Sequence, residues 1–269
     1  MVRMFADTAS VDTRAQVADG CRIGDYCTIG PDVVLQRQVE VGAHSWLDSR
    51  TTVGSGTKLA SHCLIGVGEM RRHRLGRRAK VEQILVGREV EFGRAVVIES
   101  GCYSRPTLVG DRSQLSSLSK ICRAASLGEG CHIGSAAIVG FGASLGASVR
   151  VGHGSKIDEG VRIGRNSVIG VLSHVSSDIP PHLVADGRPA MVRCINLAGL
   201  QRLGADPLTI ASLVETHRLV FRTGLPIDFA EKQLRSIGLW TPEVVELFDF
   251  LRAPAAKAQE SGRNQGRVA

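Results

Sequence analysis

The chain has 269 residues, of which 43% are apolar and only 4% aromatic, with 31 glycines and a formal net charge of +7. This length allows one large domain with a smaller appendage, and scarce aromatics beside abundant glycine indicate a narrow core of small aliphatic side chains. The charge favours anionic partners such as nucleotides, phosphates or acidic proteins, but it is modest and lacks stacking aromatic residues, which argues against nucleic-acid binding.

The N-terminal residues contain no apolar segment of the kind found in secretory signals, and no run approaches the about 18 apolar residues of a membrane span. We therefore expect a cytoplasmic protein without a membrane span. The seven cysteines are scattered, and none belongs to a Cys-x-x-Cys pair. We expect them to be reduced thiols that fill small positions in the core.

An apolar residue recurs at every sixth position over most of the chain. One series is apolar at all positions from Phe5 to Ile65, and a second from Val109 to Val175. The residue two before each member of the second series is never larger than valine, and glycine often follows the aliphatic residue. Glycine there suits a turn with unusual backbone angles. This period predicts a coil with three flat sides, each holding a short strand with one aliphatic side chain pointing inward.

The six-residue register breaks twice, and each break predicts a loop that leaves the coil. The first falls between Ile65 and Val86, as an insertion near residues 67–83, and contains a basic cluster at residues 70–80. The second is an insertion near residues 100–107. Two interpretations of the basic cluster stay open: contact with an acidic carrier protein or nucleotide phosphates, and a solvated loop.

The repeat, over residues 1–181, ends at the prolines of Asp178-Ile-Pro-Pro181, because proline cannot join a strand ladder. Helical patterns follow over residues 182–252 and predict a small domain that caps the open end of the coil. Residues 253–269 form a basic tail that is expected to be disordered. The four helices are expected over residues 195–203, from Asp206-Pro207 to near Gly224, over 228–237, and from Thr241-Pro242 through Leu251.

The repeats resemble those of the hexapeptide-repeat acyltransferases, whose coils wind left-handed. The tail is more specific, because residues 179–187, 192–204 and 217–224 are similar to the motifs VPPYVIAQG, GVNIEGLKRRG and YKLIYRSG. Those motifs belong to the UDP-N-acetylglucosamine 3-O-acyltransferases that begin lipid A synthesis. The resemblance covers nearly the whole chain. It implies an all-β left-handed parallel β-helix followed by a small α-helical C-terminal domain.

That family moves a 3-hydroxyacyl chain from acyl carrier protein to the 3-hydroxyl of UDP-N-acetylglucosamine. It works as a homotrimer with each site between neighbouring coils, and a histidine acts as general base. The resemblance thus implies three partners: an acyl carrier protein or coenzyme A thioester, a nucleotide sugar, and further copies of the chain. It implies neither a cofactor nor a bound metal. A hydroxyl that attacks a thioester needs a proton acceptor with a pKa of about 7, and the oxyanion needs an N–H donor.

The chain departs from the family at the position of that base. Matching the hexads without gaps places the base on Arg123 and an earlier motif histidine on Lys120. Three further family histidines fall on Glu99, Gly142 and Asp158. Arginine stays protonated at neutral pH, so either another group takes the proton or the chain does not perform the family reaction. The two basic residues form either an electropositive cleft for a phosphate or pyrophosphate, or a solvated surface.

Other motif positions supply candidate substrate-binding residues besides Lys120. Asn196 and Arg202 of the tail motif remain, although the acid of that motif is replaced by Ala198. A family glutamine falls on Glu159, which lies two full coils from Arg123 and therefore on the same face. Glu159 is expected to orient or pair with that arginine across roughly 9–10 Å.

Three histidines and one glutamate are candidates for other roles. His153 holds the same place in its hexad as Arg123 but on a different face, so it is either a base supplied across a subunit boundary or an exposed neutral histidine. Glu99 is a further candidate base. His44 and His62 should stack, but the His-x4-His pair of the metal-dependent carbonic anhydrase branch is missing, so we do not expect metal catalysis.

Two functions stay open at this point. The first is an O-acyltransferase that acts on a sugar nucleotide or a different glycan with an altered base. The second is a non-catalytic trimeric homologue that binds a nucleotide sugar or an acidic carrier protein.

Overall fold

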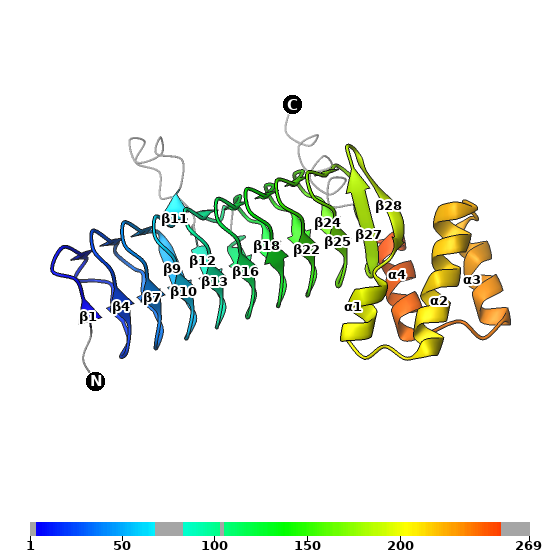
Figure 1. The fold of residues 1–269 in the computed structure, drawn as a ribbon, viewed down its shortest axis with the longest axis horizontal. Coiled ribbons are helices and arrows are strands. Elements are labelled where there is room, and N and C mark those ends of the chain that lie inside the picture. The colour runs from blue at the N-terminus through cyan, green and yellow to red at the C-terminus, as the bar shows by residue number, and fades with distance from the viewer. Residues whose placement is uncertain (1–3, 68–82, 103–104, 254–269) are drawn as a thin grey trace, which may run out of the picture.

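A computed structural model describes residues 4–67, 83–102 and 105–253, and it shows a left-handed parallel β-helix followed by a helical domain (Figure 1). Short strands stack into three sheets that form the sides of the coil, named here sheets A, B and C, with 11, 9 and 8 strands.

Sheet A contains, in spatial order, β1 (Met4–Phe5), β4 (Arg22–Ile23), β7 (Glu40–Val41), β10 (Lys58–Leu59), β13 (Glu91–Phe92), β16 (Gln114–Leu115), β19 (His132–Ile133), β22 (Arg150–Val151), β25 (Val168–Ile169), β27 (Leu183–Gly187) and β28 (Ala190–Ile195). Sheet B contains β2 (Ser10–Val11), β5 (Thr28–Ile29), β8 (Trp46–Leu47), β11 (Leu64–Val67), β14 (Val97–Glu99), β17 (Lys120–Ile121), β20 (Ile138–Val139), β23 (Lys156–Ile157) and β26 (His174–Val175). Sheet C contains β3 (Gln16–Val17), β6 (Val34–Leu35), β9 (Arg50–Val53), β12 (Gln83–Val86), β15 (Thr107–Val109), β18 (Ser126–Leu127), β21 (Ser144–Leu145) and β24 (Arg162–Ile163).

The predicted repeat is confirmed by the strand register and by burial. In sheet B, Ile121 pairs with Val139 and Val139 with Ile157, each the aliphatic residue of its hexad. These three side chains are fully buried inside the coil. One inward aliphatic per side therefore fills the interior, as in other solenoids that bury a continuous column.

The glycine after most aliphatic residues has a different reason from the one we expected. Gly66, after Ile65, has the positive φ (92°) that we expected. At Gly152, as at the other glycines of the series, φ is not positive, so the expectation was wrong there. A Cβ on Gly152 would instead lie 2.6 Å from the backbone of Gly170 in the next coil. Positive φ falls two residues later, as at Gly154 (φ 63°) and, in an earlier coil, His44 (φ 58°). Glycine follows the aliphatic residue because adjacent coils approach too closely for a side chain.

The ladder continues past the two prolines at which we expected it to end. Ile179 forms a parallel bridge with Ile163, and β27 then pairs in parallel with β25. β27 and β28 form an antiparallel hairpin in the segment where we expected the helical domain to begin. The hairpin closes the last coil, and the helices follow it.

The helical domain sits at the C-terminal end of the coil (Figure 1). Its own core includes Leu213, Leu234 and Phe248, all fully buried. Asp206 caps the longest predicted helix by accepting from the Thr209 N–H, with proline at the next position, as the sequence predicts. The elements are α1 (Leu197–Arg202), α2 (Pro207–His217), the π-helical turn η2 (Arg218–Arg222), α3 (Ile227–Ser236) and α4 (Pro242–Arg252).

No helix in residues 4–67, 83–102 and 105–253 is long and apolar enough to cross a membrane. The basic cluster at residues 70–80 and nearly all of the expected disordered tail lie outside the described residues.

Candidate functional site

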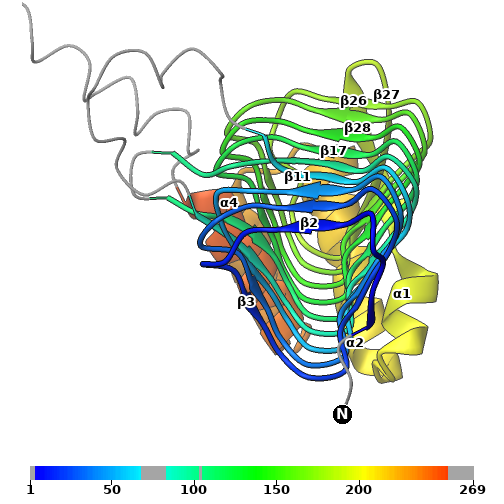
Figure 2. The same cartoon turned by 90° about the vertical axis from the view of Figure 1, so that its left-hand side faces the viewer.

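A row of polar side chains follows the border of sheet B where the chain turns toward sheet C. In the view of Figure 2, β2, β11, β17 and β26 mark this sheet along the coil. Along a strand, side chains alternate between the two faces, so the residue before each buried aliphatic points outward and the residue after it begins the turn. We call this set the sheet B edge cluster; it comprises Glu99, Lys120, Cys122, Arg123, Lys156, Asp158, Glu159 and His174.

Glu99 organises one half of this cluster. Its Oε1 atom lies 2.7 Å from Lys120 Nζ, and its Oε2 atom accepts a hydrogen bond of 3.2 Å from the backbone N–H of Arg123. The hydrogen bond with the Glu99 carboxylate raises the pKa of Lys120. Lys120 is therefore charged but already paired with Glu99. It is less available to bind an anionic ligand than the motif match implied.

Arg123 is the basic residue of this half whose side chain forms no ion pair among the described residues. Its backbone is fixed, because its N–H binds Glu99 and its carbonyl accepts from the Gly142 N–H at 2.9 Å. No carboxylate of the described ranges forms an ion pair with its guanidinium. The expected pairing with Glu159 is not formed, since Phe141 occupies the intervening coil at that place. The guanidinium is thus available to bind an anion.

Asp158 organises the other half. Its Oδ1 atom lies 2.9 Å from His174 Nε2 and 3.3 Å from Lys156 Nζ. Burial raises the pKa of Asp158, but the hydrogen bonds from His174 and Lys156 outweigh it and hold that pKa below its usual value. His174 was not predicted from the sequence, although its spacing from Asp158 gives a signal. A residue that precedes the inward aliphatic lies beside the residue that follows the aliphatic of the coil before, 16 positions earlier.

Cys122 lies between the two halves and is half-buried. Burial raises the pKa of its thiol, and the nearby Glu99 carboxylate adds to this effect. Lys120, Glu159 and Lys156 also act on this thiol electrostatically, which shows that both halves surround it. Because only the thiolate is a strong nucleophile, Cys122 is not an activated nucleophile at neutral pH.

His153, the alternative base, lies elsewhere. It follows β22 at the turn from sheet A to sheet B, is exposed, and accepts a hydrogen bond of 2.9 Å from the Ser135 N–H through Nδ1. Within one chain, the structure does not bring it together with Arg123. Glu99, the further candidate, already binds Lys120 and the Arg123 amide.

The two tail residues have different surroundings. Asn196 is buried and caps α1: its Oδ1 atom accepts from the Gly199 N–H at 3.0 Å, and its Nδ2 donates to the Asn166 carbonyl at 2.8 Å. Its side chain thus holds α1 against the coil. Arg202 is exposed at the end of α1, where its Nε donates to the Ala198 carbonyl at 3.2 Å, and it is the freer of the two to contact a ligand.

The histidines expected to stack do so, together with a tyrosine. The rings of His44 and His62 lie parallel with centroids 5.0 Å apart, and Tyr26 stacks on His44 at 5.1 Å. Among the described residues, no group of three or more histidine, cysteine or acidic side chains is placed to hold a metal ion.

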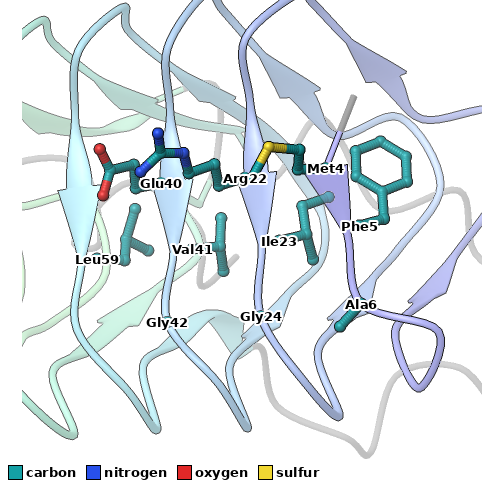
Figure 3. A pocket seen from close by; sticks show the side chains of 10 residues that line it. All are labelled: Met4, Phe5, Ala6, Arg22, Ile23, Gly24, Glu40, Val41, Gly42 and Leu59. Carbon is teal, nitrogen blue, oxygen red and sulfur yellow. The ribbon is translucent and has the colours of Figure 1, made fainter. Parts of the chain in front are cut away.

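A cavity among the described residues lies away from the sheet B edge cluster. This open depression of about 400 Å³ is on sheet A near the N-terminus (Figure 3). No residue of the sheet B edge cluster lines it. Its lining consists of Met4, Phe5, Ala6, Arg22, Ile23, Gly24, Glu40, Val41, Gly42 and Leu59.

Comparisons with known proteins place this geometry in context. Residues 178–261 match the family model described as UDP-N-acetylglucosamine O-acyltransferase, domain 2. An acyl-[acyl-carrier-protein]–UDP-N-acetylglucosamine O-acyltransferase of Syntrophobacter fumaroxidans is 35% identical over 247 residues, which cover 91% of this chain and 95% of the relative. A protein of the same name from Rhizobium johnstonii is 25% identical over 265 residues, 96% of each chain.

Solved structures share the fold. The UDP-N-acetylglucosamine acyltransferase of Bacteroides fragilis superposes with a TM-score of 0.75 at 22% identity, over 93% of this chain and 97% of that one. The UDP-N-acetylglucosamine O-acyltransferase of Moraxella catarrhalis superposes with a TM-score of 0.72 at 24% identity, over 91% and 95%.

Proposed function

Because this chain belongs to the UDP-N-acetylglucosamine O-acyltransferase family, we propose that it transfers an acyl group from a carrier thioester to a hydroxyl of a UDP-linked amino sugar. The observation that carries the proposal is the full-length match to the Syntrophobacter fumaroxidans relative, which spans both the coil and the helical domain. The reaction is the one that the resemblance assigns to lipid A biosynthesis. Acyl carrier protein is the expected donor, with a coenzyme A thioester as the alternative.

In this proposal Arg123 does not act as a base, since a guanidinium stays protonated at neutral pH. Its free guanidinium binds the diphosphate of the nucleotide sugar, for which a planar, bidentate donor is suited. Arg202 adds a second positive charge at the end of α1. Lys120 serves mainly to hold Glu99, which in turn fixes the Arg123 backbone.

We also propose a homotrimer, supported by how the outer faces differ. Sheet A presents Arg22, Lys58 and Arg150 to the outside, as a solvated face does. Sheet B presents the large apolar side chains Trp46, Leu64 and Ile138, which are 45%, 37% and 37% exposed. An outer face with these apolar side chains suits burial against a neighbouring coil. Light scattering of the purified protein measures the mass of the assembly, and a monomer would contradict this part. The cytoplasm is the expected compartment, because it supplies thioesters and nucleotide sugars.

An acyl-transfer assay tests the function. The full-length protein is incubated with UDP-N-acetylglucosamine and either 3-hydroxyacyl carrier protein or the matching coenzyme A thioester, and the acylated sugar nucleotide is detected by mass spectrometry. Formation of an ester product that depends on the protein supports the proposal.

The second candidate function is a non-catalytic binding protein, and the observation that favours it is arginine at the position of the family base. The same assay separates the two functions when binding of UDP-N-acetylglucosamine is measured alongside by calorimetry. Tight binding without turnover from any donor would support the second function and overturn the first.

A further inference from the structure

A histidine that no motif position explains forms a pair with a carboxylate in the sheet B edge cluster. His174 Nε2 and Asp158 Oδ1 lie 2.9 Å apart, and the histidine side chain is 41% exposed. Asp158 is held in turn by Lys156 and is 26% exposed, so the carboxylate is more enclosed than the imidazole it binds. The pair therefore presents a fixed ring to the outer surface of the coil.

This arrangement meets the requirements of a general base. A carboxylate that accepts from one imidazole nitrogen fixes the tautomer, leaves the lone pair of the other nitrogen free, and stabilises the imidazolium that forms on protonation. With Nε2–H donating to Asp158, the free lone pair is on Nδ1. An acceptor hydroxyl hydrogen-bonded to Nδ1 is then placed to lose its proton.

The other ionisable groups of the cluster are less suited. Glu99 is bound by an ammonium and an amide, Arg123 cannot lose its proton, and burial raises the pKa of the Cys122 thiol. His153 is on another corner of the coil. His174 is the histidine that the described structure places in the cluster.

The surface between the two halves is open at one position of the intervening coil. That coil carries Phe141 and Gly142 at the turn, and a Cβ built on Gly142 would meet no heavy atom within 4 Å. Arg123 and Asp158 lie about two strand spacings apart, roughly 10 Å. An anion at Arg123 and a hydroxyl at His174 would then be the two ends of one extended ligand that passes over Gly142.

We propose that His174, oriented by Asp158, is the catalytic base of this chain and replaces the base that the family carries at position 123. This inference rests on the proposed acyltransferase function. Nδ1 removes the proton of the acceptor hydroxyl while the oxygen attacks the thioester carbonyl carbon. As the tetrahedral intermediate collapses, the C–S bond breaks and the leaving thiolate takes the proton from the imidazolium. The products are an ester and a free thiol, and the histidine returns to its neutral form.

Charged groups face His174 from two neighbouring elements. Asp158 and Lys156 face it from the preceding coil. From the β27–β28 hairpin, Arg188 reaches the Leu172 carbonyl two residues before it. Replacement of Asp158 by asparagine removes the negative charge that stabilises the imidazolium. The acid limb of kcat/KM, which reports the essential base of the free enzyme, is then expected to move to lower pH.

The test compares H174N, D158N and H44N with the wild type in the acyl-transfer assay, from acid to alkaline pH. We expect H174N to lose about 100-fold or more in kcat with little change in the affinity for UDP-N-acetylglucosamine. D158N should lose less and shift the acid limb. H44N replaces an exposed histidine outside the cluster and should match the wild type. H174Q serves as a second replacement, and thermal melting confirms that each variant is folded.

The outcomes separate this inference from the proposed function. An active wild type with an H174N variant of equal kcat and unchanged pH profile overturns the role of His174 alone. An acid limb that does not move in D158N overturns the orienting role of Asp158. A wild type that binds the nucleotide sugar but turns over no thioester overturns both the role of His174 and the proposed function.

Discussion

The Nζ atom of Lys120 lies 2.7 Å from Oε1 of Glu99, and the same carboxylate accepts the backbone N–H of Arg123 through its other oxygen. These two contacts join adjacent strands of sheet B across the second register break. The arrangement pairs one cation of the candidate site and leaves the other free. It therefore identifies which of the two basic residues should bind an anionic ligand.

Replacement of Arg123 by alanine should weaken the binding of UDP-N-acetylglucosamine by about 10-fold or more. A hydrogen bond to a charged group contributes about 1.5–3 kcal/mol, and the guanidinium has no competing ion pair among the described residues. Isothermal titration calorimetry measures the change. Arg22→Ala on the outer face of sheet A is the matched control and should bind like the wild type. Equal losses in both variants would show a general charge effect and contradict this role.

Replacement of Asn196 by alanine should act on stability rather than directly on binding. The change removes the cap of α1 and leaves the Asn166 carbonyl without its 2.8 Å donor, for a cost of about 1–3 kcal/mol. Urea denaturation monitored by circular dichroism measures it. Arg202→Ala, at the exposed end of the same helix, should change stability by less than about 0.5 kcal/mol. An Asn196→Ala variant as stable as the wild type would contradict the structural role.

The inward position of each hexad should tolerate truncation poorly. Ile133 is fully buried inside the coil, so Ile133→Ala should cost about 2–5 kcal/mol in the free energy of unfolding. Arg150, from the adjacent strand of the same sheet, points outward, and Arg150→Ala should change stability by less than about 0.5 kcal/mol. Chemical denaturation of both variants checks the difference. Similar losses at the two positions would contradict the assigned register.

The contact between the helical domain and the coil should weaken in acid. Burial raises the pKa of Glu246, but hydrogen bonds from His182 and Arg165 outweigh it and hold the pKa below the usual 4.5. A lowered folded-state pKa stabilises the fold above 4.5, and this contribution is lost as the pH falls through the folded-state value.

Glu246→Gln tests this contribution. The variant should be less stable than the wild type at neutral pH by at most about 1 kcal/mol, because the carboxylate is partly exposed and screened by solvent. The difference should shrink as both proteins are acidified below pH 4.5. Denaturation midpoints over a pH series measure it, and a difference that stays constant into acid would exclude the carboxylate as the cause.

The coil could be predicted from sequence because each hexad repeats one local rule. The inward aliphatic is required at every side of every coil, so strands such as β17 and β23 follow from the period alone. The β27–β28 hairpin breaks the period and contains no repeat, so its pairing depends on the coil that it closes. The helical domain could be predicted from residues that begin and end helices. Asp206 before proline marks the start of α2, and Gly238 follows the end of α3.

The site could be predicted only where it coincides with motif positions. Matching to the family motif identified Lys120, Arg123 and Asp158, but the one partner expected from it, Glu159 for Arg123, forms no ion pair with that arginine among the described residues. The second loop lengthens the chain between Glu99 and Lys120 but keeps Ile98 opposite Ile121, so the two residues meet although their sequence spacing differs from that of the other coils. His174 belongs to no motif, and its contact with Asp158 arises from the offset between successive coils. The contacts of Glu99 with Lys120 and of His174 with Asp158 depend on how successive coils stack. Matching the sequence residue by residue to a motif does not describe that stacking.

The rate of acyl transfer from 3-hydroxyacyl carrier protein to UDP-N-acetylglucosamine tests the central claim most directly, measured for the wild type, H174N and H44N under one set of conditions. We predict an acylated sugar nucleotide from the wild type and from H44N at similar rates, and a rate at least about 100-fold lower from H174N. Binding of the nucleotide sugar by the wild type without any ester product, from either carrier protein or coenzyme A thioesters, would contradict the account.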